Sequence, residues 1–433
     1  MVSDRDHRDQ AIDRATRSFI RAGRDPETFS DGPLMIALAR EKNRTLHVSK
    51  RIVCLLEGTL YESPHAPLRA PQVADVSAAA QLSDAYEREG EAVFPRLRGE
   101  FWALVWSRPE RRGLVVSDQI GSRAPYWSRD RGGLIVASEV AELLSALTRQ
   151  PEPDPIELAH WLMITGPRAG KTLLGGLESV RAGHLLRVAT DRCSSERYWS
   201  PSHQQPFSGP ASEQAARLRS ALEVAVERRL AAGRPSGILL SGGLDSSTVA
   251  GLAAGKGELR AYSAVFPDHP GLDESELINR TVSQLGVTST RIVVRTGSTI
   301  QGAIGYTNAW KLPPTSPNLF FWSPLLKRAA ADGIDVMLDG EGGDELFGFS
   351  PFLLADRLHQ LRLITALRLA RRWPGETQSP PRELVWLRLR EAGITALIPP
   401  SAHHLSRRRR GIDHYVPGLS LIHISEPTRQ AEI

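Results

Sequence analysis

Residues 237–250 read GILLSGGLDSSTVA, and the second half of the chain is organised around this stretch. A short apolar run, typical of a buried strand, leads into Ser241 and two glycines, and a segment compatible with a helix follows. The glycines let the backbone approach a ligand, and the helix N-terminus offers free N–H groups and a positive dipole. The stretch therefore predicts a strand, an anion-binding turn that suits a pyrophosphate, and a helix.

A second polar turn, DGEGGDELF at residues 339–347, follows the apolar run DVML. Strands and helices alternate around the two turns, which predicts a parallel sheet flanked by helices, with ligands at the carboxyl ends of the strands. Both turns lie at such ends, so Asp245 and Asp344 are expected to share a divalent ion. Mg²⁺ suits oxygen ligands and phosphates best. The expected strands cover residues 237–240, 261–266, 290–294 and 335–340. The expected helices cover 246–254, 274–286 and 323–333, and before them comes a helix that Ser212 can cap and that carries Leu218, Leu222, Val226 and Leu230.

The first half of the chain has a different pattern, in which short apolar runs alternate with turn residues between positions 46 and 187. This pattern predicts antiparallel strands together with two helices, an α+β layered domain. Residues 201–212, PSHQQPFSGPAS, are rich in proline and serine and predict a linker. The expected strands cover 51–58, 101–107, 113–118, 133–138 and 184–188, and the expected helices cover 76–90 and 140–150.

Composition excludes several classes of protein. Hydrophobic residues make up 41% of the 433 residues and charged residues 24%, and no apolar run reaches the roughly 18 residues that a membrane span requires. The charged N-terminus is unlike a signal peptide, and two cysteines are too few for a disulfide framework, so a soluble cytoplasmic protein is expected. The net charge of +5 comes with scattered arginines, so no nucleic-acid binding is expected, and the run Arg407–Arg410 is given no role.

The end of the chain is unusual. Residues 419–429, LSLIHISEPTR, resemble the translation of an adapter used in sequencing-library preparation. The natural sequence is therefore expected to break off near Gly418, and residues 419–433 are expected to be foreign to it.

The motifs resemble a known family. SGGLDSS resembles the pyrophosphate loop of the N-type ATP pyrophosphatases, and DGEGGDELFG with LDESE (272–276) resembles the asparagine synthetase family. In the first half, segments such as CLLEGTLYES and VVSDQIGSRAPYW resemble a class II glutamine amidotransferase domain. The resemblance covers about residues 50–350. It implies an N-terminal layered αββα domain (1–200), the linker, and an α/β parallel-sheet ATP-pyrophosphatase domain (213–418).

The departures from the family concern its ammonia source. Glutaminases of this class use a cysteine directly after the initiator methionine, whereas this chain opens Met1, Val2, Ser3. Cys54 lies in an apolar run and is predicted to be a core residue. Glu57-Gly58 stands where the family has an Asn-Gly that helps to form the oxyanion hole, and a carboxylate there repels an oxyanion. Release of ammonia from glutamine is therefore not expected.

A synthetase without ammonia needs another amine. Lasso peptide cyclases use a peptide's N-terminal amine, and β-lactam synthetases close a small ring. Residues 159–188 resemble lasso cyclases, whereas Glu341 and Gly343 stand where the β-lactam branch tends to have other residues. The lasso interpretation is preferred. Glutamine-independent asparagine-synthetase-like amidation, β-lactam closure and an inactive peptide-binding module stay open.

GPRAGKT (166–172) has the wrong glycine spacing for a phosphate-binding Walker loop and predicts a connection.

The resemblance implies an AMP-forming carbon–nitrogen ligase that uses ATP and Mg²⁺. Glu341 is implied to orient or deprotonate the amine, and Asp245 and Asp344 to hold Mg²⁺. The implied partners are a precursor core peptide, a leader-binding protein and a cysteine protease of the same pathway. Relatives also use a lysine downstream of the second acidic turn, but no lysine follows Lys327, so this chain is expected to be impaired or inactive. The residues implied to bind the nucleotide are Ser241, Gly242, Gly243, Asp245, Ser246 and Gly340.

Overall fold

The computed structural model describes residues 4–39, 43–62, 77–131, 133–163, 165–189, 192–201, 207, 209–230, 234–295, 298–314, 316, 318–347, 352–373 and 380–397. Its internal contacts divide the chain into two compact units, Met1–Gly340 and Glu341–Ile433. The adapter-like tail and the run Arg407–Arg410 lie outside the described residues.

The N-terminal domain is built on a six-stranded antiparallel sheet with the strand order β11-β10-β6-β5-β4-β3. A three-stranded sheet, β8-β7-β9, and a separate hairpin, β1-β2, accompany it. The strands are β1 (Pro26–Asp31), β2 (Leu34–Ala39), β3 (Arg44–Val48), β4 (Ile52–Glu62), β5 (Arg98–Ser107), β6 (Arg112–Ser117), β7 (Tyr126–Asp130), β8 (Gly133–Ala137), β9 (Leu177–Ser179), β10 (His184–Val188) and β11 (Cys193–Arg197). The helices are α1 (Asp4–Arg21), α2 (Ala78–Glu89), η1 (Gly90–Arg96), α3 (Val140–Ala146) and α4 (Pro155–Leu162).

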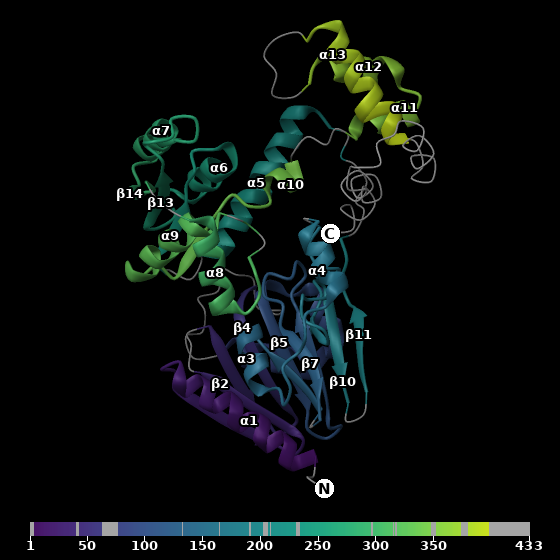
Figure 1. The fold of residues 1–433 in the computed structure, drawn as a ribbon, viewed down its shortest axis with the longest axis vertical. Helices are drawn as coiled ribbons and strands as arrows, with labels where there is room; N and C mark the ends of the chain where they lie inside the picture. Colours follow the sequence, from purple (N-terminus) through teal and green to yellow (C-terminus); the bar gives the residue numbers. More distant parts are fainter. Residues whose placement is uncertain are drawn as a thin grey trace. The chain divides into compact units, whose positions relative to one another are not determined.

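The six-stranded sheet is buried on both faces because side chains alternate along each strand. Leu56 of β4 faces a core that includes Leu82 of α2. Leu55, the next residue along, faces the opposite core, which includes Ile36 of β2 and is packed against side chains of β7 and β8. Helix α1 runs beside β2 and α3 (Figure 1). The domain thus has helix, sheet, sheet and helix layers, which confirms the predicted layered α+β fold.

The second domain of the first unit has a four-stranded parallel sheet with the strand order β14-β13-β12-β15. Two clusters cover its faces. One contains side chains of α5, α6 and α7, and the other contains Leu325 and Ala329 of α9. The predicted α/β parallel sheet is confirmed. Its elements are α5 (Ala211–Leu230), β12 (Ser236–Leu239), α6 (Leu244–Ala253), β13 (Leu259–Val265), α7 (Ser275–Leu285), β14 (Thr288–Val293), α8 (Thr299–Trp310), α9 (Leu319–Ala331) and β15 (Val336–Leu338).

The second unit is helical in its described part. Its core forms around Leu354, Ala366, Ala370 and Val385. The elements are α10 (Gly343–Phe347), α11 (Leu353–His359), α12 (Leu363–Arg371), α13 (Arg382–Arg388), η2 (Leu389–Ile394) and η3 (Thr395–Leu397). Across all the described segments of both units, no helix combines the length and the apolar character needed to cross a membrane.

Some elements differ from the prediction. Helices α1, α4, α8 and α10 to α13 and strands β1, β2, β3, β7, β9 and β11 are additional to the predicted set. The prediction that Ser212 caps a helix is wrong, because α5 begins at Ala211 and Ser212 lies inside its first turn. The described residues of the segment 166–172 form turns and an isolated bridge, which confirms the predicted connection.

One buried carboxylate organises the loop after β6. Asp118 is fully buried and accepts hydrogen bonds from four backbone N–H groups at 3.0–3.2 Å. The donors are the backbone amides of Phe101, Ile120, Ser122 and Arg123. A single side chain therefore satisfies three backbone N–H donors of the loop and connects the loop to β5 through a fourth, that of Phe101.

Replacing this carboxylate is expected to destabilise the N-terminal domain. Asp118→Ala leaves four backbone donors without their acceptor, and we expect its free energy of unfolding to fall by about 3 kcal/mol. Urea denaturation followed by tryptophan fluorescence measures the change. Asp84→Ala, on the exposed side of α2, is the matched control and should leave the denaturation midpoint in place. Equal midpoints for the two variants would contradict the role given to Asp118.

Candidate functional site

The two polar turns leave the sheet from adjacent strands. Strand β12 pairs with β13 on one side and with β15 on the other, so the strand order reverses at β12. In β15, Met337 is the register partner of Gly237, and Leu338 is the partner of Ile238. Ligands of open parallel sheets bind at such a reversal, beyond the carboxyl ends of the strands. The SGGLDSS turn follows β12 there, and the DGEGGDE turn follows β15.

The first turn is shaped by glycine and closed by serine hydroxyls. Gly242 has φ +87°, and a Cβ there would lie 2.8 Å from Cβ of Leu277 in α7, so a side chain is excluded. The hydroxyls of Ser241 and Ser246 are 3.0 Å apart, and the Gly243 N–H donates to the Ser241 oxygen at 3.3 Å. The turn thus brings backbone N–H groups and hydroxyls together at the start of α6, a ready site for an anion.

The second turn lies against the first at Gly340. A Cβ on Gly340 would lie 2.6 Å from the backbone nitrogen of Ser246 and 3.0 Å from Cβ of Asp245. Only glycine permits this approach, because real Cβ atoms do not come so close to backbone. The structure therefore brings together six residues singled out from the sequence, all in the first unit, namely Ser241, Gly242, Gly243, Asp245, Ser246 and Gly340.

The donor set suits Mg²⁺ bound together with phosphates. Asp245 lies in the first turn of α6, where a carboxylate adds the hard oxygen ligand that Mg²⁺ prefers. Among the described residues no group of three or more His, Cys, Asp or Glu side chains could hold a metal by itself. Mg²⁺ commonly takes one or two carboxylates and completes its shell with phosphate oxygens and water. Glu341 and Asp344 belong to the second unit, so the ion shared by Asp245 and Asp344 stays a prediction.

Two further side chains hold the edge of this site, and the sequence analysis gave them no role. The Ser263 hydroxyl in β13 donates to the Leu240 carbonyl at 2.6 Å, just before the first turn. Asp273 accepts from the Phe266 N–H and from the Ser275 hydroxyl, both at 2.9 Å, and the backbone bond lowers the pKa of Asp273. Asp273 thereby joins the end of β13 to the start of α7. The signal for this role that the sequence offered was an acidic residue directly before the helix expected at 274–286.

In the N-terminal domain Glu57 is held in an ion-pair network. Arg44 and Glu57 are direct register partners on β3 and β4, and the Arg44 Nη2 lies 2.7 Å from Glu57 Oε2. The Ser138 hydroxyl donates to the same oxygen at 2.5 Å. An ionised carboxylate only accepts hydrogen bonds. The Glu57 side chain is therefore a hydrogen-bond acceptor whose charge is compensated by Arg44, and it offers no donor to an oxyanion.

Cys54 is also unsuited to nucleophilic chemistry. It lies fully buried within β4, in the core shared with α2, which confirms the prediction of a core residue. Burial raises the pKa of its thiol well above the usual range. Because the thiolate is the nucleophile, Cys54 is inert in the folded protein.

The fold and the two turns define an ATP-pyrophosphatase-like domain that follows an amidotransferase-like domain, and comparison with known families agrees. Residues 217–409 match the asparagine synthase family, and residues 48–199 match the glutamine amidotransferase domain family. The chain therefore carries an asparagine synthase domain and a glutamine amidotransferase domain, the two domains implied by its predicted membership of the asparagine synthetase family.

Curated relatives carry related names. "Amidase chyE" of Penicillium rubens is 27% identical over 64% of this chain and 43% of the relative. "Amidase chry2" of Gibberella zeae is 26% identical over 64% and 43%. "Asparagine synthetase [glutamine-hydrolyzing] 3" of Bacillus subtilis is 23% identical over 63% and 46%. The chain thus spans less than half the length of these relatives.

Solved structures show weaker similarity. Glutamine phosphoribosylpyrophosphate amidotransferase from B. subtilis matches with a TM-score of 0.29 and 12% identity, over 65% of this chain and 63% of that one. Glutamine-dependent NAD+ synthetase from Acinetobacter baumannii matches with a TM-score of 0.24 and 12% identity, over 71% and 81%.

The contact at Gly340 gives a first test of the site. Gly340→Ala places a methyl group against the backbone of α6 and should separate the two turns, so we expect ATP affinity to fall about tenfold or more. Isothermal titration calorimetry measures the affinity. Gly251→Ala, on α6 where a Cβ meets no atom within 4 Å, is the control and should bind ATP normally. Normal binding by Gly340→Ala would show that the contact does not shape the site.

The two cysteines give a second test. Native protein treated with iodoacetamide should be modified at half-buried Cys193 and not at buried Cys54, because alkylation needs an accessible thiolate. Mass spectrometry of the digested protein measures both sites. The same treatment in guanidinium chloride is the control and should modify both cysteines. Rapid modification of Cys54 in the native protein would contradict its assignment to the core.

Proposed function

We propose that this protein forms an amide bond at the expense of ATP, through an acyl-adenylate, and closes a macrolactam between a peptide's N-terminal amine and an Asp or Glu side chain. The observation that carries the proposal is the contact between the SGGLDSS and DGEGGDE turns at the reversal of a parallel sheet. It is supported by the asparagine synthase match, since such synthetases activate a carboxylate with ATP.

Two features of the N-terminal domain support the proposal that the reacting amine is not ammonia released from glutamine. Cys54 is buried and inert, and Glu57 accepts hydrogen bonds where an oxyanion would need a donor. A substrate that carries its own amine needs no such site. A peptide with a free N-terminus and an acidic side chain contains both reactants in one molecule.

The reaction has two steps that balance. A carboxylate oxygen of the peptide bonds to the α-phosphorus of ATP, and pyrophosphate leaves with the electrons of the broken P–O bond. The peptide amine then bonds to the acyl carbon, AMP leaves, and Glu341 takes the proton that the amine loses. General-base assistance of this kind typically contributes about 100-fold or more.

The remaining residues bind and orient. The backbone and hydroxyls of Ser241, Gly242, Gly243 and Ser246 would hold the β- and γ-phosphates, with Gly340 keeping the second turn close. Asp245 and Asp344 would hold Mg²⁺, which when bound offsets the negative charge of the phosphates. Ring closure also needs the two ends of the peptide to be held together, so positioning should supply much of the rate.

The proposal includes partners that fit this chemistry. The precursor core peptide is the substrate. A leader-binding protein would deliver it, and a cysteine protease would expose its N-terminal amine before ring closure.

Two variants separate the proposed roles. Asp245→Asn should reduce peptide-dependent pyrophosphate release about 100-fold or more, because the phosphates lose a metal ligand. Glu341→Gln should retain ATP–pyrophosphate exchange while amide formation slows about 100-fold, because only the second step needs the base. Mass spectrometry detects the product as the peptide minus one water.

The controls define what would contradict the proposal. Glu258→Gln, 80% exposed and at the opposite end of the sheet, should behave as the unaltered protein. An N-acetylated peptide, or one with its acidic residue amidated, should give no ring. Product formation only when ammonia is supplied would favour asparagine-synthetase-like amidation. Peptide binding without any pyrophosphate release would favour an inactive binding module.

A further inference from the structure

The N-terminal domain contains a partly open cavity that the proposed ATP chemistry does not use. Its volume is about 380 Å³, and its walls come from α1, α3, the β1-β2 hairpin and strands β3 to β8, with a contribution from the region of β10 and β11. Native cores rarely leave voids much larger than a water molecule, whereas small-molecule sites measure about 300–1,000 Å³. The size of this cavity is that of a ligand site.

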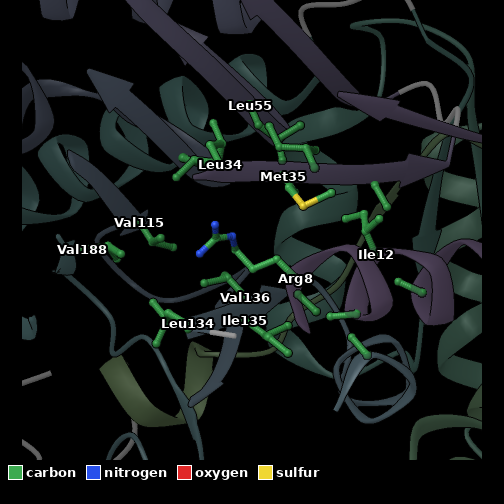
Figure 2. Close-up of a pocket in the computed structure, with 18 of the residues that line it drawn as sticks. Arg8, Ile12, Leu34, Met35, Leu55, Val115, Leu134, Ile135, Val136 and Val188 are labelled. Atoms are coloured by element: carbon green, nitrogen blue, oxygen red, sulfur yellow. The ribbon is translucent and has the colours of Figure 1, made fainter. Parts of the chain in front are cut away.

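Most of the wall is apolar. Figure 2 shows Leu34, Val115, Leu134, Val136 and Val188 around the cavity, on strands of both sheets and the hairpin. Side chains of this kind bind an apolar body by excluding water from it.

The acidic groups at the wall already have partners. Glu142 pairs with Arg24 at 3.1 Å, and the Asp130 carboxylate accepts from the Thr148 N–H and hydroxyl at 2.7 Å. Arg44, which also lines the cavity, pairs with Glu57. These charges are compensated without a ligand.

Arg8 differs from them. It lies on the face of α1 that also carries Ile12, Ala15 and Phe19, and all four line the cavity. Residues spaced by three, four and seven share one helix face, so a cation stands within an otherwise apolar stripe. Figure 2 shows the Arg8 guanidinium directed into the cavity. Within the described ranges of the chain, Arg8 forms no hydrogen bond or ion pair.

A second donor lines the same cavity. Trp102 is 6% exposed, and its indole N–H is buried without an acceptor among the described residues. Buried donors are normally paired, and a charge directed at apolar surroundings is costly unless an anion compensates it. The unpaired guanidinium of Arg8 indicates a missing anion, and the unpaired indole N–H of Trp102 indicates a missing hydrogen-bond acceptor.

We propose that this cavity binds an amphipathic monocarboxylate, with its apolar chain against the strand walls and its carboxylate on Arg8. The guanidinium fork matches a carboxylate in shape, and one unit of negative charge balances the charge of Arg8, whereas Arg129, which also lines the cavity, is exposed to solvent. A phosphate dianion would leave a charge uncompensated beside Asp130 and Glu142. All of the lining residues lie between His7 and Cys193, so the proposal does not depend on the ATP-binding turns.

Decanoate is the probe, with decanol as the neutral compound of equal chain length, both titrated by calorimetry into the intact protein below micelle-forming concentrations. Decanoate should bind at least about tenfold more tightly than decanol, because only the carboxylate forms charge-assisted hydrogen bonds with the Arg8 guanidinium. Arg8→Gln should lower decanoate affinity about tenfold or more and leave decanol affinity unchanged. Arg5→Gln, exposed on the same helix and outside the cavity wall, is the control and should bind decanoate normally.

Three results would overturn the proposal. Equal affinity for decanol and decanoate would show that the cavity recognises no anion. Unchanged decanoate affinity in Arg8→Gln would show that the arginine is not its partner. Absence of binding by either probe, with circular dichroism confirming a folded protein, would show that the cavity is no site for a small ligand. None of these results bears on pyrophosphate release, so the two proposals fail independently.

Discussion

The close approach of Gly340 to the first turn of α6 is the constraint on which the proposed nucleotide site depends. A side chain at Gly340 would collide with the backbone of Ser246, so the two polar turns meet only because glycine is present. The approach also requires β15 to lie beside β12, with β13 and β14 on the other side. The strand order therefore places the starts of both turns at one edge of the sheet, and the lack of a side chain lets Gly340 lie against α6. The serine hydroxyls and Asp245 gain their significance from that arrangement.

This part of the site could be predicted from the sequence because its signals are local. An apolar run, glycines and a helix start lie within fourteen residues of GILLSGGLDSSTVA, and the rule for parallel sheets relates the two turns. Helix α8 shows why other elements could not be predicted. Its sequence contains Gly302 and Gly305, which disfavour a helix, yet a Cβ at Gly302 would lie 3.1 Å from Phe320. Close packing with the start of α9 thus overrides local propensity. Charged residues along α1 conceal its apolar face in a similar way.

Glu57 shows a limit of a different kind. The sequence identifies a carboxylate where a donor is expected, and so predicts that an oxyanion is disfavoured. It does not show how the domain tolerates that carboxylate in a buried position. Arg44 lies directly across the β3-β4 pair, which strand register can indicate, whereas Ser138 is 81 residues away and meets Glu57 only in the folded domain. The network fills the position with a fixed, compensated negative charge, which leaves no donor for a developing one.

A substrate that carries its own amine changes what the N-terminal domain has to do. Its interior no longer needs a nucleophile or an oxyanion donor, and structural requirements such as the Asp118 loop and the two cores remain. A largely apolar cavity into which Arg8 points is compatible with those requirements. A ligand bound there stabilises the folded domain by mass action, in proportion to the logarithm of its concentration over its dissociation constant. Such binding would act on the folded population of the whole first unit, and it would do so without touching the residues proposed to bind ATP.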